Sequence, residues 1–244
     1  MAGNHYQTCI ELYKLNKSFG SHQVLKNINI GLEKGRICGI VGANGAGKST
    51  LLRIIAGVLH RTNGSIIYNK PYVEGKCMLH KSAFISDVPY FLPGSDIGRM
   101  AKFLVSNIDW LKETCEKFDL NMNKKISKFS GSNKQLSAIL LALSCKPRLL
   151  IADEPFEGLD PVMRTAVKKL IIDEVQSNEM SVIIAPHSLR ELEDLCDYLI
   201  ILHKGEIIEK TEMSDLRRSM FKGQIAFSED YDYSNIPGGE ADGQ

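Results

Sequence analysis

The sequence predicts an α/β fold whose mostly parallel sheet is interrupted by a helical insert. Two short runs of continuous apolar residues, RLLIA (148–152) and SVIIA (181–185), are typical of parallel strands that are covered on both faces. A stretch with helical spacing of its apolar residues separates these two runs. Residues 87–128 also have helical spacing, which predicts a helical insert between the two halves of the core.

Length and composition limit the class of protein. At 244 residues, the chain is long enough for one large domain or for a core with a subdomain. Its 43% hydrophobic and 24% charged residues are those of an ordinary soluble globular protein. The net charge of +1 argues against nucleic acid as the main partner, because it creates no strong positive field.

Cysteine spacing and hydropathy exclude further classes. The six cysteines are scattered singly without a CxxC pair, which indicates reduced thiols rather than a metal centre. The N-terminus has no apolar region of the kind found in secretory signals. No stretch approaches the roughly 20 apolar residues of a membrane-spanning helix. If the protein works at a membrane, we expect another chain to span it.

The first part of the chain is expected to contain strands around one helix. TCIELYKL, VLKNINIGL, RICGIVG and, further on, GSIIYN are the expected strands. GKSTLLRIIAGVL has helical spacing, with Leu51, Leu52 and Ile55 on one side, and ends at the turn cluster HRTNGS.

The helical insert is predicted from regularly spaced apolar side chains. They are Met100, Phe103, Leu104, Trp110, Leu111 and Cys115. We expect the single tryptophan in the core rather than in a ligand site, because large aromatic side chains are mostly buried.

Further helices and a hairpin are expected after residue 153. Asp160 and Pro161 open a helix, since proline favours the first helical position. The apolar stripe of that helix consists of Met163, Val167, Leu170, Ile171 and Val175. Ser188 and Glu191 have the spacing of a capping box and predict another helix. YLIILHKGEIIEK predicts a closing hairpin that turns at Lys204. The acidic residues 222–244 are expected to form a solvated tail.

GANGAGKST (42–50) matches the phosphate-binding pattern G-x-x-x-x-G-K-[ST] between a strand and an apolar helix. Glycines let the backbone N–H groups of such a loop wrap phosphate oxygens, and the positive end of the following helix faces the same charge. Lys48 would reach the β- and γ-phosphates, Ser49 would bind Mg²⁺, and Thr50 would add a hydrogen bond. The predicted nucleotide contacts are Gly42, Asn44, Gly45, Gly47, Lys48, Ser49 and Thr50.

Two acids and a histidine follow the ends of buried strands. Asp153 and Glu154 end RLLIADE, and His187 ends SVIIAPH. Because ligands bind at the carboxyl edge of a parallel sheet, we expect all three near the phosphate-binding loop. Asp153 would hold Mg²⁺, Glu154 would orient or deprotonate an attacking water, and His187 would stabilise the γ-phosphate. Alone, Asp153 also fits a helix cap, and His187 an ordinary core or surface histidine.

Together these motifs resemble the ATP-binding cassette (ABC) ATPases over residues from about 8 to 210. The matching elements are the aromatic residue before Gly20, GANGAGKST, FISDVP, FSGSNKQ, LLIADEP, EGLD and APHSLRELEDL. The resemblance implies a P-loop NTPase core with a mostly parallel sheet, an N-terminal antiparallel β subdomain and a helical subdomain at about residues 87–140. It also implies that this ABC ATPase domain spans residues 8–221.

The resemblance implies roles for further residues. Phe19 resembles the aromatic side chain that stacks on adenine, with a core phenylalanine as the alternative. GLD (158–160) matches the loop that communicates across the ATPase dimer. FSGSNKQ takes the place of the LSGGQ signature, so Ser130 and Gly131 would bind the γ-phosphate of ATP held by a second subunit. In isolation, Ser130 is also a helix cap.

Two departures from the family pattern stand out. Ser132 replaces the second glycine of the signature and Asn133 replaces its glutamine, so we expect a working but weakened signature. Asp87 stands where the family usually has a glutamine that contacts Mg²⁺ and the attacking water. A carboxylate there can hold Mg²⁺ or its water, although the phosphates repel it. The alternative is that Asp87 caps the following segment.

The function implied by the resemblance is that of an ATP-binding and ATP-hydrolysing subunit of an ABC transporter, with ATP and Mg²⁺ as ligands. Its partners would be a separate transmembrane permease and a second ATPase subunit, identical or different, placed head-to-tail on the cytoplasmic face of the membrane. The short insert and Asp87 resemble subunits that export drugs, antibiotics or peptides. A soluble ABC ATPase with a non-transport role, or a subunit with weakened hydrolysis, is the alternative.

Overall fold

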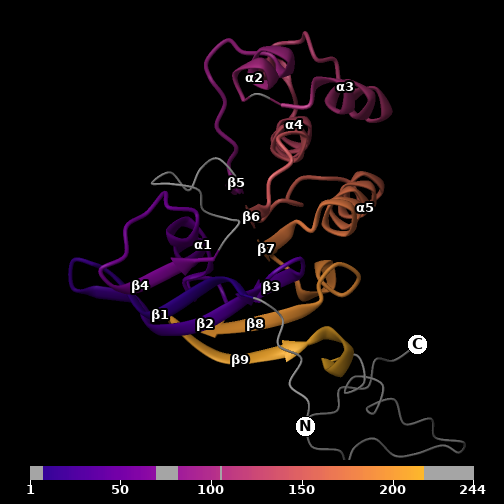
Figure 1. Ribbon diagram of the computed structural model, residues 1–244. Coiled ribbons are helices and arrows are strands. Elements are labelled where there is room, and N and C mark those ends of the chain that lie inside the picture. Colours follow the sequence, from indigo (N-terminus) through magenta and orange to yellow (C-terminus); the bar gives the residue numbers. More distant parts are fainter. Residues whose placement is uncertain (1–7, 70–81, 105, 217–244) are drawn as a thin grey trace, which may run out of the picture.

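A six-stranded sheet forms the centre of the fold, in the order β5-β6-β7-β3-β8-β9 (Figure 1). The computed structural model describes residues 8–69, 82–104 and 106–216. The parallel strands are β5 (Ser82–Ile85), β6 (Leu149–Asp153), β7 (Ser181–Ala185), β3 (Ile37–Val41) and β8 (Tyr198–His203). β9 (Glu206–Glu212) pairs with β8 in the antiparallel direction. The predicted parallel sheet and closing hairpin are therefore confirmed.

A separate three-stranded antiparallel sheet contains most of the N-terminal residues. Its order is β2 (His22–Glu33), β1 (Thr8–Phe19) and β4 (Asn63–Tyr68), which confirms the predicted antiparallel part. The helix α1 (Lys48–Ile55) lies between β3 and β4 in the chain. It is shorter than predicted, because Gly57 has a φ of 73°, the left-handed conformation that ends helices.

Three helices follow β5. They are α2 (Ile97–Phe103), α3 (Ile108–Lys117) and α4 (Gly131–Ser144), with a 3₁₀ turn, η2 (Ile126–Lys128), before α4. Asp96 and Asn107 cap α2 and α3 with side-chain oxygens that accept first-turn N–H groups. Leu111 and Cys115 of α3 are buried, and Trp110 is partly buried against the same core. The expected place of the tryptophan is thereby supported, whereas Phe103 is 71% exposed.

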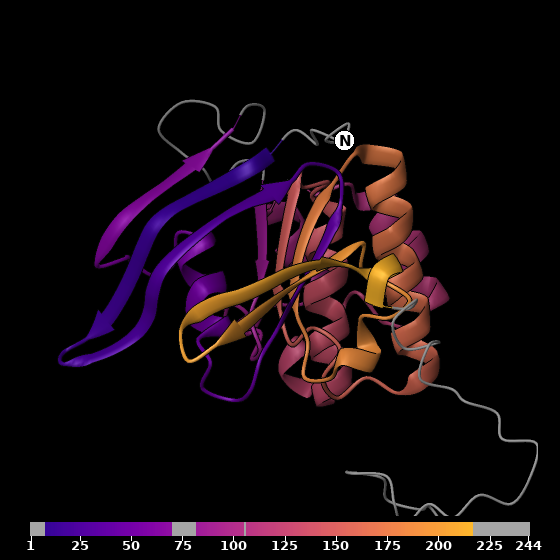
Figure 2. The ribbon, with the colours of Figure 1, turned by 90° about the horizontal axis from the view of Figure 1, so that it is seen from below.

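The helix α5 (Pro161–Asn178) joins β6 to β7 and begins as predicted, with Asp160 as its cap. Figure 2 shows α5 on one side of the six-stranded sheet and α1 on the other. Leu150 and Ala152 of β6 belong to the apolar core that contains residues of α4 and α5. Leu149 and Ile151 belong to the core that contains residues of α1 and the antiparallel sheet. This double burial explains the continuous apolar runs in the sequence.

The prediction of a helix after Ser188 is wrong. Only a 3₁₀ turn, η3 (Leu189–Glu191), forms there. The Ser188 hydroxyl accepts a hydrogen bond from the Arg190 N–H at 3.3 Å. Glu191 does not complete a capping box, because its carboxylate pairs with Arg164 of α5 at 2.9 Å. A tertiary ion pair has therefore taken the side chain on which the local motif depends.

Two predictions concern residues outside the described part of the chain, namely the acidic tail at 222–244 and the domain end at 221. In the described ranges, no helix combines the length and apolar character needed to cross a membrane. The five described cysteines, Cys9, Cys38, Cys115, Cys145 and Cys196, all have free thiols.

Candidate functional site

The carboxyl ends of four neighbouring strands bring the predicted site residues to one edge of the sheet. Asp87 follows β5, Asp153 and Glu154 lie at the end of β6, His187 follows β7, and Lys48 follows β3. Parallel strands that lie side by side end at the same edge, so residues far apart in sequence meet there. The site is consequently built by the topology of the sheet.

Close packing of the loop between β3 and α1 explains two of its glycines. A Cβ atom on Gly42 would lie 2.2 Å from the Leu202 carbonyl oxygen of β8. Gly47 has a φ of 107°, and its Cβ would lie 2.8 Å from Leu25 Cδ2. Side chains at these positions would push the loop off the sheet or distort its backbone. Asn44 and Gly45 are exposed between them.

Lys48 folds back over this loop. Its Nζ donates hydrogen bonds to the carbonyl oxygens of Gly42 at 2.7 Å and Ala43 at 3.3 Å, and the residue is buried. No side chain caps the start of α1. The first-turn N–H groups, including those of Ser49 and Thr50, therefore remain for an anionic ligand.

Asp153 is 1% exposed, and both of its carboxylate oxygens are buried without a hydrogen bond of ordinary geometry to any described residue. Burial raises the pKa of the Asp153 carboxyl, the Ser49 hydroxyl lowers it, and the charge of Asp87 raises it again. A buried carboxylate without a partner is unstable, and a bound cation would remove that cost.

The donor set at Asp153 fits Mg²⁺. Magnesium prefers oxygen ligands and is held by one or two carboxylates together with substrate phosphates. Asp153 and the Ser49 hydroxyl supply oxygen atoms of this type. In the described ranges, no three acidic, histidine or cysteine side chains gather into a ready-made metal cage. This arrangement suits a cation that arrives with a nucleotide.

Glu154 is held in an unusual backbone conformation beside His187. Its φ of 48° lies in the left-handed region, which is uncommon for a residue with a long side chain and is frequent at functional sites. The Glu154 N–H donates to the Ala185 carbonyl of β7 at 2.9 Å. Its Oε1 lies 3.5 Å from Nδ1 of His187. Burial and a hydrogen bond with Glu157 raise the pKa of Glu154, whereas His187 lowers it.

Asp87 forms an ion pair that the sequence analysis missed. Its Oδ1 lies 3.2 Å from Nη2 of Arg53 in α1, and both side chains are about 40% exposed. The alternative was that Asp87 caps the following segment; the hydrogen bond that its carboxylate accepts comes from Arg53 instead, and Asp96 caps α2. The available signal was the position of Arg53, one helical turn after Ser49 and therefore on the same side of α1.

Ser130 and Gly131 lie elsewhere in the molecule, at the start of α4 (Figure 1). The Ser130 hydroxyl accepts a hydrogen bond from the Asn133 N–H at 3.2 Å and lies 3.0 Å from the Ser132 hydroxyl. The helix-cap prediction is therefore confirmed, and a Cβ on Gly131 would meet no atom within 4 Å. Ser130 and Gly131 do not join the Lys48 site of the same chain.

Phe19 ends β1 with half of its surface exposed, so its alternative assignment to the core is wrong. Lys17 Nζ lies 4.5 Å from the centroid of its ring, a cation–π contact that the sequence analysis missed. An exposed aromatic ring at the end of a strand can stack on a planar ligand.

Replacement of Asp153 by Asn is expected to stabilise the ligand-free protein by on the order of 1 kcal/mol at pH 7, because it removes a buried, unpartnered charge. A raised pKa means that the folded state binds more protons than the unfolded state, so this carboxyl destabilises the fold as the pH rises through its raised pKa. The gain should therefore shrink as the pH falls toward 3.8, the ordinary Asp value. Urea unfolding in EDTA measures it, with the exposed Asp173→Asn as control. Destabilisation at pH 7 would contradict this account of the site.

Known proteins are similar to this chain in sequence and in fold. Residues 25–157 match the family described as ABC transporter. The lantibiotic transport ATP-binding protein SrtF of Streptococcus pyogenes is 31% identical over 226 residues, which cover 89% of this chain and 98% of SrtF. The ABC transporter ATP-binding protein YtrB of Bacillus subtilis is 30% identical over 93% of this chain and 82% of YtrB. The solved structure of an ATP-binding subunit of an ABC transporter has a TM-score of 0.77 and 25% identity, and covers 88% of this chain and 94% of its own. The chain therefore belongs to the ABC transporter family, as an ATP-binding subunit.

Proposed function

We propose that this chain hydrolyses ATP to drive export through a separate membrane permease. The observation that carries the proposal is the convergence of Lys48, Asp153, Glu154 and His187 at one sheet edge. Lysine, two carboxylates and a histidine beside a phosphate-binding loop match the needs of phosphoryl transfer, which depends mainly on positioning and charge stabilisation.

In this proposal, the loop before α1 binds the nucleotide phosphates. Lys48 exchanges its hydrogen bonds to the Gly42 and Ala43 carbonyls for the β- and γ-phosphates, which are stronger acceptors because they are charged. Ser49 and Asp153 hold Mg²⁺, which when bound neutralises phosphate charge and orients the phosphates. Phe19 stacks on the adenine through its exposed ring.

Glu154 is the proposed general base. It lies beside the phosphate-binding edge. The pKa of its carboxyl is raised toward the operating pH, which suits a general base. His187, at 3.5 Å from Glu154, donates a hydrogen bond to the γ-phosphate and opposes the rise of the Glu154 pKa. Asp87 would hold Mg²⁺ or its water, after its ion pair with Arg53 has opened.

The proposed active form is a head-to-tail dimer with two nucleotides. Ser130 and Gly131 lie apart from Lys48 within the chain, so they complete the site of a second subunit. The Ser130 hydroxyl is close to that of Ser132, which competes for the hydrogen bond that a γ-phosphate would receive. This contact supports a weakened signature and leaves a pairing with a different, intact subunit as the alternative assembly.

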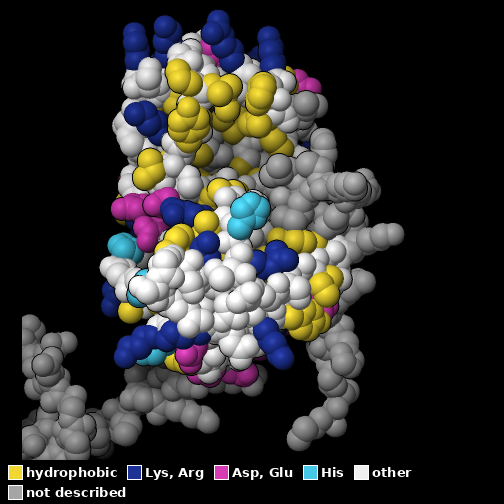
Figure 3. Space-filling view, turned by 90° about the vertical axis from the view of Figure 1, so that its left-hand side faces the viewer, with side chains coloured by type: hydrophobic (Ala, Val, Ile, Leu, Met, Phe, Trp, Pro, Cys, Tyr) yellow, Lys and Arg dark blue, Asp and Glu magenta, His cyan; other side chains and the backbone are white. Residues whose placement is uncertain are grey.

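An apolar surface beside Asp87 supports the permease as a partner. A groove of about 760 Å³ lies between β5, residues 86–91, α2 and α4. Val88, Tyr90 and Phe103 beside it are 75%, 82% and 71% exposed, and Figure 3 shows hydrophobic side chains gathered on this face. Exposed apolar patches of this kind mark interaction sites. We assign the groove to a cytoplasmic segment of the permease, which would act directly on the loop that carries Asp87.

Export of a peptide or antibiotic is the proposed direction and cargo class. This proposal rests on the similarity to SrtF, which is named a lantibiotic transport protein, and on the short helical insert and Asp87. The chain would then lie at the cytoplasmic face of the membrane. A permease of the export class that co-purifies with the chain would support this direction, and a substrate-uptake permease would contradict it.

Glu154→Gln is expected to lower ATP hydrolysis at least about 10²-fold, because the amide cannot accept a proton from water. ATP affinity should change by no more than a few-fold, since the phosphate-binding loop is unaltered. Steady-state phosphate release and equilibrium ATP binding measure the two effects, with Glu209→Gln on the exposed face of β9 as control. Equal hydrolysis by the wild type and Glu154→Gln would exclude the enzymatic proposal.

Ser132→Gly is expected to raise ATP-dependent dimerisation of the Glu154→Gln form, because Ser130 loses its competing hydroxyl neighbour. Light scattering at several protein concentrations measures the dimer fraction. Ser132→Ala keeps the Cβ atom and removes only the hydroxyl, so it separates crowding from hydrogen bonding. Unchanged dimerisation in both variants would refute a weakened signature.

Phe103→Glu is expected to release the permease, because a charge in the apolar groove is desolvated on binding. Detergent extraction followed by mass spectrometry measures the co-purified polytopic protein. ATP hydrolysis by the isolated subunit should remain unchanged. Ile208→Glu, on a part of β9 outside the groove, is the matched control. Retention of the permease by Phe103→Glu would contradict this interface.

A further inference from the structure

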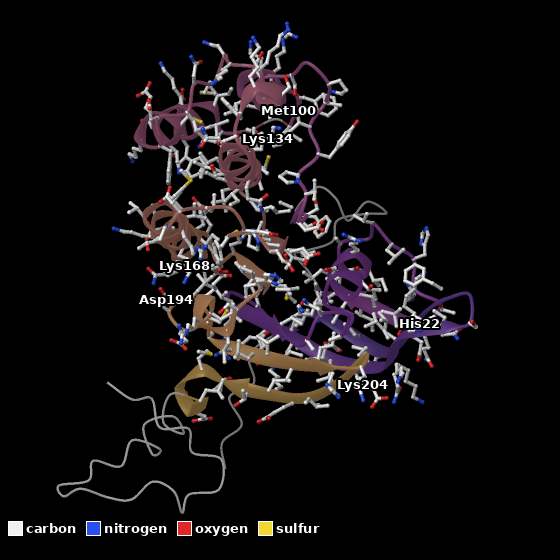
Figure 4. All side chains as sticks on the ribbon, turned by 180° about the vertical axis from the view of Figure 1, so that it is seen from behind. His22, Met100, Lys134, Lys168, Asp194 and Lys204 are labelled. Carbon is white, nitrogen blue, oxygen red and sulfur yellow. The ribbon has the colours of Figure 1, made fainter. Side chains whose placement is uncertain are left out.

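Two basic side chains of α5 pair with the segment that follows His187. Arg164 Nη1 lies 2.9 Å from Glu191 Oε1, and Lys168 Nζ lies 2.6 Å from Asp194 Oδ1. The basic residues are one helical turn apart, so both face the same neighbouring segment. Figure 4 shows Lys168 and Asp194 directed toward one another.

The two pairs are partly buried, unlike ordinary surface ion pairs. The exposed fraction is 10% for the Lys168 side chain, 14% for Glu191 and 34% for Arg164. Only Asp194, at 66%, is largely in solvent. Solvent and salt screen buried pairs less than exposed ones, so these contacts can hold the segment in one position.

Arg164 also contacts the loop that precedes α5. Its Nη2 donates a hydrogen bond to the Leu159 carbonyl oxygen at 3.2 Å. This loop contains Gly158, with a φ of 73°, and ends at Asp160, the cap of α5. The planar guanidinium has several donors in a rigid fork. One side chain therefore touches both the 158–160 loop and the segment that carries His187.

The segment after His187 is held by these ion pairs together with apolar burial, since Leu192 is 0% exposed and belongs to the apolar core. Its backbone hydrogen bonds are local, as in Glu191 N–H to the Ser188 carbonyl and Leu192 N–H to the Leu189 carbonyl. The helix predicted there does not form, because Glu191 pairs with Arg164 instead of capping it. A segment without a regular helix is held mainly by side-chain contacts with its neighbours.

We infer that Arg164 is a positioning residue that links the 158–160 loop to His187, with Lys168 as a second anchor. The inference rests on the proposed function, in which His187 acts on the γ-phosphate and the loop faces the second subunit. When a partner subunit presses on the loop, Arg164 moves with Leu159 and shifts Glu191. His187, four residues earlier in the chain, shifts with it. Closure of the dimer thereby sets the place of His187.

The test measures hydrolysis and dimerisation separately in Arg164→Met. Its kcat is expected to fall about tenfold or more, because His187 loses its defined position. KM for ATP is expected to stay within about twofold of the wild type, because Arg164 does not touch the phosphate-binding loop. In the Glu154→Gln background, ATP-dependent dimerisation by light scattering is expected to persist.

A double-mutant cycle with Glu191→Gln tests whether the two residues act together. The double variant is expected to be no slower than the slower single variant, because both substitutions remove the same ion pair. Glu191→Gln preserves the shape of the side chain and tests the link if Arg164→Met does not fold. Arg190→Met is the matched control, since Arg190 is exposed on the same segment, and its kcat is expected to equal that of the wild type.

Three results would overturn the inference: a wild-type kcat in Arg164→Met, strictly additive losses in the cycle, or an equal loss of kcat and dimerisation. The last would mean that Arg164 only stabilises the fold. These failures are distinct from failure of the proposed function, in which the wild type itself hydrolyses no more ATP than Glu154→Gln.

Discussion

The buried carboxylate of Asp153 is the constraint on which the site depends. It lies at the end of a strand that is covered on both faces, with no hydrogen-bond partner of ordinary geometry in the described part of the chain. Such a group opposes folding unless a cation compensates it. β6 is an inner strand between β5 and β7, and its two faces are covered by two separate apolar cores. The burial of β6 between two layers therefore explains both the layered fold and the expected affinity of Asp153 for a cation.

Around this carboxylate, the fold holds several groups in positions that they would not adopt in isolation. Glu154 has a left-handed backbone, Lys48 folds onto carbonyl groups, and the start of α1 has no side-chain cap. The left-handed backbone and the uncapped N–H groups cost stability in the ligand-free protein. The hydrogen bonds of Lys48 to carbonyl groups are, in the proposed mechanism, exchanged for phosphate. The sheet tolerates these costs because its two apolar cores are continuous and well buried.

The regions that we propose to face other molecules are organised differently from the site. The groove beside Asp87 exposes apolar side chains, and Ser130 begins a helix away from Lys48. In the proposed assembly, partner subunits complete both features, whereas ligands alone occupy the sheet edge. Asp87 beside the groove pairs with Arg53, and Glu191, four residues after His187, pairs with Arg164, which also contacts the 158–160 loop. The proposed transmission between partners thus passes through a few ion pairs.

The sequence by itself determined the parallel strands, the phosphate-binding loop, the cap of α5 and the closing hairpin, because these depend on local spacing and on residues adjacent in the chain. Only the tertiary structure decided which acids have partners. The capping box at Ser188 does not form, because Glu191 makes an ion pair with Arg164. Asp87 likewise makes an ion pair with Arg53. The exposure of Phe103 and Phe19 also depends on what packs against them. Ion pairs and burial join residues far apart in sequence, so no local pattern contains them.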